Sequence, residues 1–195
     1  MKMFPLEACS VPGCGKLAAF RRPTCLAHSP ERAELQREIR DFLSSQDPLA
    51  DLALAHLELE GLELSRKRIQ FCCFSHARLR RVRFDECHIR LLFLDFATLE
   101  ECSFAGVKAH CLVLGGARIS SCSFTDAELL RSNFIGVQGR EVSFDGSDLY
   151  TSRFSGSTLE GVSFRDCNLK RARFERCTLT AVDFRSSNTE EAFFA

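Results

Sequence analysis

Three cysteines and one histidine near the start of the chain have the spacing of a metal site. They follow the pattern C-x4-C-x10-C-x2-H, with ligand positions at Cys9, Cys14, Cys25 and His28. Three thiolates and one imidazole suit tetrahedral Zn²⁺. Each pair would lie on a tight turn, and Gly13 and Gly15 would let the first turn wrap closely around the ion.

The segment that carries these residues, 1–30, contains few large apolar side chains. So small a unit cannot bury enough apolar surface to fold alone, and a metal is the usual staple. Its two runs, residues 9–15 and 25–28, also resemble small bacterial and phage zinc-binding modules. We therefore predict a structural Zn²⁺ site in residues 1–30. The alternative is a leader in which the thiols cluster by chance.

A five-residue period occupies most of the remaining chain. Every fifth residue from Leu54 to Phe194 gives 29 positions, of which eleven are Phe, twelve Leu and three Ile. The residue two places earlier is almost always Ala, Cys, Val or Ser from Cys72 onward. Side chains two apart in an extended segment face the same way, so a small and a large side chain point inward together. The next two residues then turn a corner.

The number of sides in each coil follows from the large residues of this period. When the large residues are read at intervals of 20 positions, Phe and Leu fall mostly into separate columns. One column begins with Leu64 and Phe84 and continues with Phe up to Phe184, whereas an interval of 15 mixes Phe with Leu. The interval of 20 also brings Arg66 to Glu86, and opposite charges on adjacent strands are mildly stabilising. We therefore predict a four-sided coil of twenty residues per turn.

Two runs carry a resemblance to a known family: Phe84-Asp85-Glu86-Cys87-His88-Ile89 and Val162-Ser163-Phe164-Arg165-Asp166-Cys167-Asn168-Leu169. They resemble pentapeptide-repeat proteins, and the likeness extends over most of residues 49–195. It implies an all-β solenoid, a right-handed quadrilateral β-helix of about seven coils. With the N-terminal segments, the expected fold is this β-helix plus a small zinc-binding-like module and a capping α-helix.

Residues 31–48 are predicted to form that amphipathic capping helix and a linker. Ser29 is a favourable cap and Pro30 a favourable first helical residue. An apolar stripe at helical spacing follows, formed by Leu35, Ile39, Phe42 and Leu43. Residues 49–64 fit either a second helix or a first coil. Because Lys67 occupies an inward position, we expect the regular coils to begin near Ile69.

An apolar cluster at outward positions predicts a binding surface for a protein partner. It consists of Phe71, Leu91, Phe93, Phe96 and Val113, with Cys73 and Cys111 beside them. Exposed apolar clusters of this kind usually mark interfaces. The alternative is that the helix stripe or the zinc module packs against them.

The chain ends in Phe193, Phe194 and Ala195 without a capping helix. A bare last coil exposes strand edges that can pair with another copy. Many pentapeptide-repeat proteins dimerise through this end. The resemblance therefore implies a homodimer whose interface includes Phe193 and Phe194.

The charge balance and the absence of targeting signals narrow the classes of protein and the cellular compartments that fit the sequence. Lys+Arg and Asp+Glu are 26 each, which argues against a basic nucleic-acid coat and an acidic DNA mimic. No signal peptide or membrane-spanning run appears, and the odd number of 11 Cys is typical of free thiols and metal ligands. We therefore expect a cytoplasmic protein that is not associated with a membrane.

No catalytic constellation is visible, so we predict a non-enzymatic protein-interaction scaffold. The family resemblance suggests an alternative, protection or inhibition of a type II topoisomerase such as gyrase by DNA mimicry, but residues 51–195 carry 20 acids and 19 Lys+Arg. A second alternative is nucleic-acid binding through the zinc module and an arginine cluster formed by Arg78, Arg80, Arg81, Arg83 and Arg90. Each of these arginines is also placed to pair with an acid.

Overall fold

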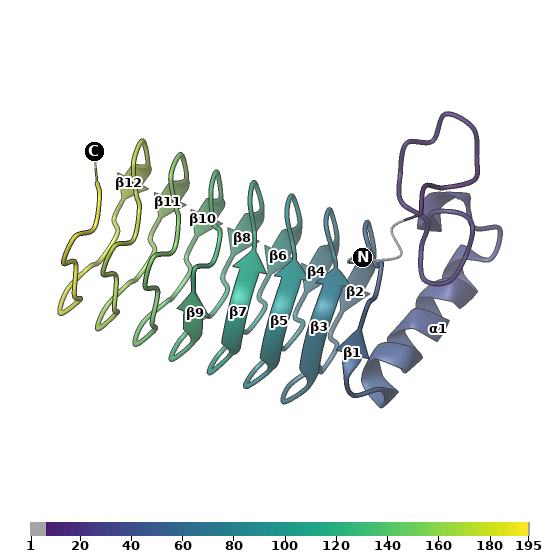
Figure 1. Cartoon of the computed structure of the whole chain (residues 1–195), viewed down its shortest axis with the longest axis horizontal. Coiled ribbons are helices and arrows are strands. Elements are labelled where there is room, and N and C mark those ends of the chain that lie inside the picture. Colours follow the sequence, from purple (N-terminus) through teal and green to yellow (C-terminus); the bar gives the residue numbers. More distant parts are fainter. Residues whose placement is uncertain (1–6, 195) are drawn as a thin grey trace.

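The computed structural model describes residues 7–194 and forms an elongated rod with a small unit at its N-terminal end (Figure 1). The unit contains the 3₁₀ helix η1 (Leu26–His28) and the helix α1 (Arg32–Ser45). The rod is a stack of parallel strands in which each residue pairs with the residue twenty positions later, as Leu49 does with Ile69. Residues 49–194 therefore complete about seven coils, which confirms the predicted β-solenoid.

Two opposite walls of the rod are continuous parallel sheets (Figure 1). The first sheet has the order β1 (Leu49–Ala50), β3 (Arg68–Cys73), β5 (His88–Phe93), β7 (Lys108–Val113) and β9 (Glu128–Leu130). The second, which we call the seven-stranded sheet, contains β2 (Glu58–Glu60), β4 (Arg78–Arg80), β6 (Thr98–Glu100), β8 (Arg118–Ser120), β10 (Gln138–Arg140), β11 (Thr158–Glu160) and β12 (Thr178–Thr180). Isolated parallel bridges hold the other two walls, again at a spacing of twenty residues.

The predicted column of large residues fills the interior. Phe84 stacks on Phe104 and Phe104 on Phe124, with ring centroids 4.6 and 4.7 Å apart. Phe134, from the opposite wall, meets Phe124 edge to face at 6.0 Å. Offset and edge-to-face contacts add to the burial of these rings. The four-sided coil is confirmed by these contacts, because phenylalanines from two facing walls meet in the middle.

The corners repeat as regularly as the core. Every fifth residue from Asp51 to Glu191 has a positive φ, between 50° and 76°. The left-handed region crowds Cβ against the backbone and favours glycine. Gly116, with φ of 66°, is one of seven glycines in this column, and the other 22 positions hold side chains. The stacked coils therefore hold most corners in a conformation that their residues do not prefer.

Small inward residues also bond the coils to one another. The Cys87 thiol donates to the Leu64 carbonyl at 3.0 Å, and the Ser157 hydroxyl donates to the Phe134 carbonyl at 2.8 Å. In both cases the acceptor lies 23 residues earlier, on the preceding coil. Burial raises the pKa of the Cys87 thiol to about 12 and that of Cys72 to about 11. These thiols are therefore protonated core groups.

The N-terminal end of the rod departs from expectation in two ways. Helix α1 begins at Arg32, and Ser29 instead ends η1, its N–H donating to the Leu26 carbonyl at 3.4 Å. Residues 49–64 form the first coil, so the expected start near Ile69 is wrong. Lys67 does occupy an inward position, but its Nζ reaches the Ser44 and Gln46 carbonyls at 2.9 and 2.7 Å. The ammonium thereby satisfies the carbonyl end of the helix.

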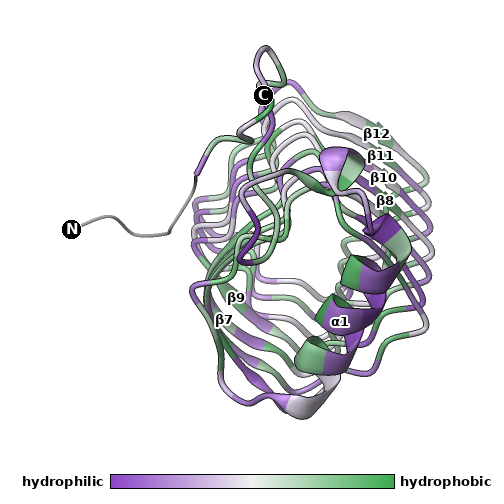
Figure 2. Ribbon diagram, turned by 90° about the vertical axis from the view of Figure 1, so that its right-hand side faces the viewer, coloured by the Kyte–Doolittle hydropathy of each residue, from purple (hydrophilic) through white to green (hydrophobic). Residues whose placement is uncertain are grey.

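Helix α1 lies across one side of the end of the first coil (Figure 2). Its buried residues Leu35, Ile39 and Leu43 join the same apolar core as Leu49 and Leu52. Within residues 7–194, no helix is both long and apolar enough to cross a membrane.

Candidate metal centre and interaction surfaces

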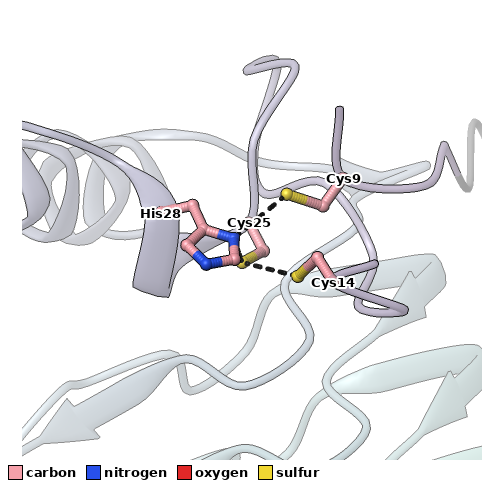
Figure 3. Close-up of side chains that lie close together, drawn as sticks. All are labelled: Cys9, Cys14, Cys25 and His28. Atoms are coloured by element: carbon pink, nitrogen blue, oxygen red, sulfur yellow. Dashed lines mark hydrogen bonds between the residues drawn. The ribbon is translucent and has the colours of Figure 1, made fainter. Parts of the chain in front are cut away.

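The four predicted metal ligands lie together at the N-terminal unit (Figure 3). Their ligand atoms are all within 4.8 Å of one another. The Nδ1 atom of His28 is 3.5 Å from the sulfur of Cys9 and 3.5 Å from that of Cys25. The sulfurs of Cys14 and Cys25 are 3.7 Å apart. This arrangement of three thiols and one imidazole could hold one metal ion.

Two local structures bring these ligands together. Cys9 and Cys14 flank a turn closed by an antiparallel bridge between Ala8 and Leu17, and the Cys14 N–H donates to the Val11 carbonyl at 3.2 Å. Gly13 and Gly15 have φ of 77° and 65°, as the predicted tight turn requires. Cys25 directly precedes η1, which carries His28.

The thiols are chemically unequal before any metal binds. Desolvation acts to raise the pKa of Cys9, but hydrogen bonds from the Cys25 and Val11 backbone and from His28 and Cys14 outweigh it and lower the pKa to about 6. A hydrogen bond from the Lys16 backbone acts to lower the pKa of Cys14, yet desolvation and the neighbouring thiols leave it raised. Metals bind the thiolate form of cysteine, and the lowered pKa favours that form at Cys9.

The N-terminal unit is held together by its own aromatic contacts and is also hydrogen-bonded to the rod. The Phe20 ring packs edge to face on Phe42 of α1, with centroids 5.0 Å apart, and the guanidinium of Arg21 lies over both rings. The Phe20 N–H donates to the Ala53 carbonyl of the first coil at 3.1 Å. An ion in the Cys/His cluster would therefore brace a unit that already contacts the end of the solenoid.

The predicted apolar cluster lies on one wall of the rod, but it is less exposed than expected. Only Phe96 is largely exposed, at 60%, and its ring stacks on His76 with centroids 5.2 Å apart. Phe93 and Val113 are half-buried, as are the corner residues Phe71 and Leu91. Four of the five side chains are therefore partly covered, and Phe96 alone among the five is largely exposed.

Two other parts of the protein lie beside the cluster. The guanidinium of Arg90 lies over the Phe71 ring, 5.1 Å from its centroid. The metal-cluster turn, through Lys16 and Leu17, lines a cavity of about 320 Å³ together with Phe93. The apolar stripe of α1 lies in the core at the rod end instead, so that alternative cover for the cluster is wrong.

A comparison with protein families identifies the C-terminal part of the rod. Residues 117–194 match the family described as "Pentapeptide repeat region". These residues belong to the pentapeptide-repeat family. The same register of twenty residues continues from this pentapeptide-repeat region back to Leu49 without a break. No curated protein matches the chain.

Three solved structures to which the chain is similar illustrate the comparison. Full-length QnrB1, a plasmid-mediated fluoroquinolone resistance protein, is 13% identical, with 72% of this chain and 91% of that chain covered and a TM-score of 0.36. HetL, a pentapeptide repeat protein of the cyanobacterium Nostoc, is 15% identical, with 80% and 92% covered and a TM-score of 0.29. A thylakoid-lumen pentapeptide repeat protein of Arabidopsis thaliana is 17% identical, with 72% and 72% covered and a TM-score of 0.25.

The surface charges of the pentapeptide-repeat rod are largely paired between coils. Arg66 contacts Glu86 at 3.2 Å and Lys108 contacts Glu128 at 3.1 Å, as the step of twenty predicts. In the arginine cluster, Arg80 contacts Glu60 and Glu100, Arg81 contacts Glu60, and Arg83 contacts Glu63 and Asp85. Three of the five arginines of the cluster are therefore paired with acids, whereas Arg90 lies over the Phe71 ring and Arg78 forms no ion pair among the described residues.

The last described coil of the pentapeptide-repeat rod leaves aromatic rings open. Phe193 is 55% exposed and Phe194 is 47% exposed, although Phe194 still stacks on Phe174 at 5.1 Å. Leu179, on the adjoining wall, is 38% exposed. The interior column is thus uncovered at this end, whereas residues of α1 pack against it at the other.

Proposed function

We propose that the chain is a non-enzymatic protein-interaction scaffold. Its rod would present the wall that carries Phe71, Leu91, Phe93, Phe96 and Val113 to a protein partner. The single observation that carries this proposal is the Phe96 ring, which is 60% exposed on an otherwise regular surface. An aromatic ring held rigidly by a stacked neighbour can act as an anchor at low entropic cost.

The ion that we propose for the Cys/His cluster is Zn²⁺ in a structural role. Support comes from the ligand set of three thiols and one imidazole, which prefers zinc, and from the closeness of the four ligand atoms. All four positions would be taken by protein ligands, which is typical of a structural site rather than a catalytic one. The zinc would hold the N-terminal unit against the first coil.

We also propose a homodimer through the C-terminal coil and a cytoplasmic location. The open rings of Phe193 and Phe194 support the dimer, because pairing of two coil ends would bury them.

The eleven cysteines are free in the structure, which supports a reducing compartment.

The partner surface can be tested by affinity capture from the native host, comparing the wild type with Phe96→Glu. Leu130→Glu is the matched control, because Leu130 is 38% exposed and lies on the first sheet in β9. We expect a partner that binds the wild type and Leu130→Glu but not Phe96→Glu, and that rebinds as a purified protein with the same preference. A partner that binds all three proteins equally would contradict the proposed surface.

A further inference from the structure

A second concave surface lies where α1 meets the seven-stranded sheet. It is a groove of about 820 Å³ lined by Arg37 and Arg40 of the helix and by Arg78, Arg80 and Arg118 of the sheet, with Glu58, Glu60 and Glu100. A shallower hollow of about 400 Å³ shares Thr98, Glu100 and Arg118 with it and continues along the sheet as far as Glu160. The two hollows therefore adjoin one another along the seven-stranded sheet.

Each carboxylate of the groove is paired with at least one arginine. Glu58 is paired with Arg32 at 3.2 Å, and Glu100 with Arg80 at 3.9 Å. Glu60 is paired with both Arg80 and Arg81. These acids therefore offer little attraction to a basic ligand.

Several of the arginines, by contrast, lack an acidic partner. Among the residues that the structure describes, Arg37 and Arg78 form no ion pair, and Arg118 contacts only the amide oxygen of Gln138, at 3.3 Å. Arg40 donates to the Glu60 and Gly61 carbonyls at 2.7 and 3.3 Å, so its charge is also unbalanced by an acid. The groove therefore carries an excess of positive charge, with more arginines than carboxylates along its lining.

The register of the sheet fixes the spacing of this charge. Arg78 pairs with Thr98 and Thr98 with Arg118, so the two arginines stand two strands apart on one line along the axis. With strands about 4.8 Å apart, the separation of their Cα atoms is about 10 Å. A polyproline II segment rises about 3.1 Å per residue with three residues per turn, so its side chains at i and i+3 lie on one face about 9.3 Å apart.

We propose that this groove binds an acidic, extended segment of a protein partner, with carboxylates at i and i+3 paired to Arg78 and Arg118. Arg37 lies at the helix end of the same groove and adds to the field that attracts the segment. Arginine pairs with carboxylate through two parallel hydrogen bonds, which gives such a contact directional preference.

The same geometry disfavours duplex DNA as the occupant. Duplex DNA carries one charge per about 1.7 Å of its axis. Its phosphates would therefore also approach Glu60 and Glu100, which line the groove beside the two arginines. In a peptide with a carboxylate at every third residue, two successive carboxylates would match the spacing of Arg78 and Arg118.

This inference deepens the proposed scaffold function by giving a partner chemistry to a surface other than the wall around Phe96. The test uses the whole chain and a fluorescent peptide with four Glu-Pro-Pro repeats, followed by anisotropy at low ionic strength. We expect binding that Arg78→Gln with Arg118→Gln weakens at least tenfold. A peptide of the same composition with its four glutamates in one block should bind more weakly than the repeat.

The matched control is Arg131→Gln with Arg176→Gln, which removes the same charge from two exposed corners of the rod. Unchanged peptide affinity in this control, with unchanged unfolding of both double variants, supports the proposal. Absence of peptide binding would overturn it, as would an equal loss of affinity in the control. Tighter binding of a 20-base-pair duplex through Arg78 and Arg118 would also overturn it. None of these results would alter the outcome of the Phe96→Glu experiment.

Discussion

The imidazole of His56 stacks on that of His76, with ring centroids 4.8 Å apart and 10° between the ring planes. The two rings occupy the same corner of successive coils, and Phe96 continues the stack on the third. Desolvation lowers the pKa of His56, and the charges of His76 and Lys16 lower it further. The folded protein therefore binds a proton at His56 less readily than the unfolded chain does.

A pH dependence of stability follows from that pKa. Because the unfolded chain takes up more protons as the pH falls through about 6.5, the free energy of unfolding should decrease between pH 7.5 and 5.5. His56→Gln should reduce this decrease, whereas His110→Gln, at an exposed strand position, should not. Urea unfolding at both pH values measures the effect, and equal pH slopes for the wild type and His56→Gln would rule it out.

Removal of the proposed zinc should loosen one end of the molecule and leave the rest intact. The purified protein is expected to contain one equivalent of zinc, and Cys14→Ser should lose it, while Cys111→Ser should retain it because Cys111 lies outside the cluster. Elemental analysis measures the zinc content. In hydrogen exchange, a chelator should speed exchange at residues 8–28 but not in β4 to β10. Full zinc occupancy in Cys14→Ser would be inconsistent with the proposed ligands.

Two buried serines in the small inward column should respond oppositely to loss of the hydroxyl. Ser157 accepts from the Val137 N–H at 3.0 Å and donates to the Phe134 carbonyl, whereas the Ser132 hydroxyl has no hydrogen-bond partner. Ser157→Ala should therefore lower the free energy of unfolding by about 1–3 kcal/mol. Ser132→Ala should leave it unchanged or raise it slightly. Denaturant unfolding of the two variants provides the comparison, and similar losses in both would show that the bonds between coils contribute little.

The stacked phenylalanines should matter more in the middle of the rod than at its open end. Phe124 is fully buried between Phe104 and Phe144, so Phe124→Ala should cost about 3–5 kcal/mol through lost burial and a cavity. Phe194 is 47% exposed, and Phe194→Ala should cost much less in the monomer. Equal losses, measured by urea unfolding, would mean that the rod does not unfold as the packing suggests.

The proposed dimer gives Phe193 a separate test. Phe193→Glu places a charge among the open rings of the last coil and should shift the protein from dimer to monomer in sedimentation velocity at micromolar concentration. Leu130→Glu, far from that end, should remain dimeric. A wild-type protein that sediments as a monomer over this range would remove the basis for the interface.

Most of the rod was predictable because each inward position repeats at a fixed interval. Leu64 and Phe84 lie in the same column of the sequence and on the same wall of the structure. Lys67 misled the prediction because an inward lysine normally ends a core column. Here its ammonium reaches past the core to two helix carbonyls. That contact depends on where α1 lies, which no local pattern specifies.

The surfaces were less predictable than the metal cluster. Cys9 and His28 could be paired from spacing because a metal demands a known ligand number. The partial cover of Phe71 comes from Arg90, whose reach along the wall depends on its rotamer. The groove beside Arg78 has no signature in the sequence, because it arises only when Arg37, from a helix about forty residues away, lies against the sheet.

Because the repeat of twenty residues is unbroken, every five residues turn the chain by a quarter of a revolution about the rod axis. Removing twenty residues between equivalent corners, for instance 117–136, would shorten the rod by one coil and leave every later face pointing as before. Removing five would turn everything beyond the cut by a quarter of a revolution. The angle about the rod axis between the wall that carries Phe96 and the exposed rings at Phe193 is therefore set by the number of residues between them. A partner that binds both surfaces would tolerate the loss of a whole coil far better than a deletion that rotates one surface relative to the other.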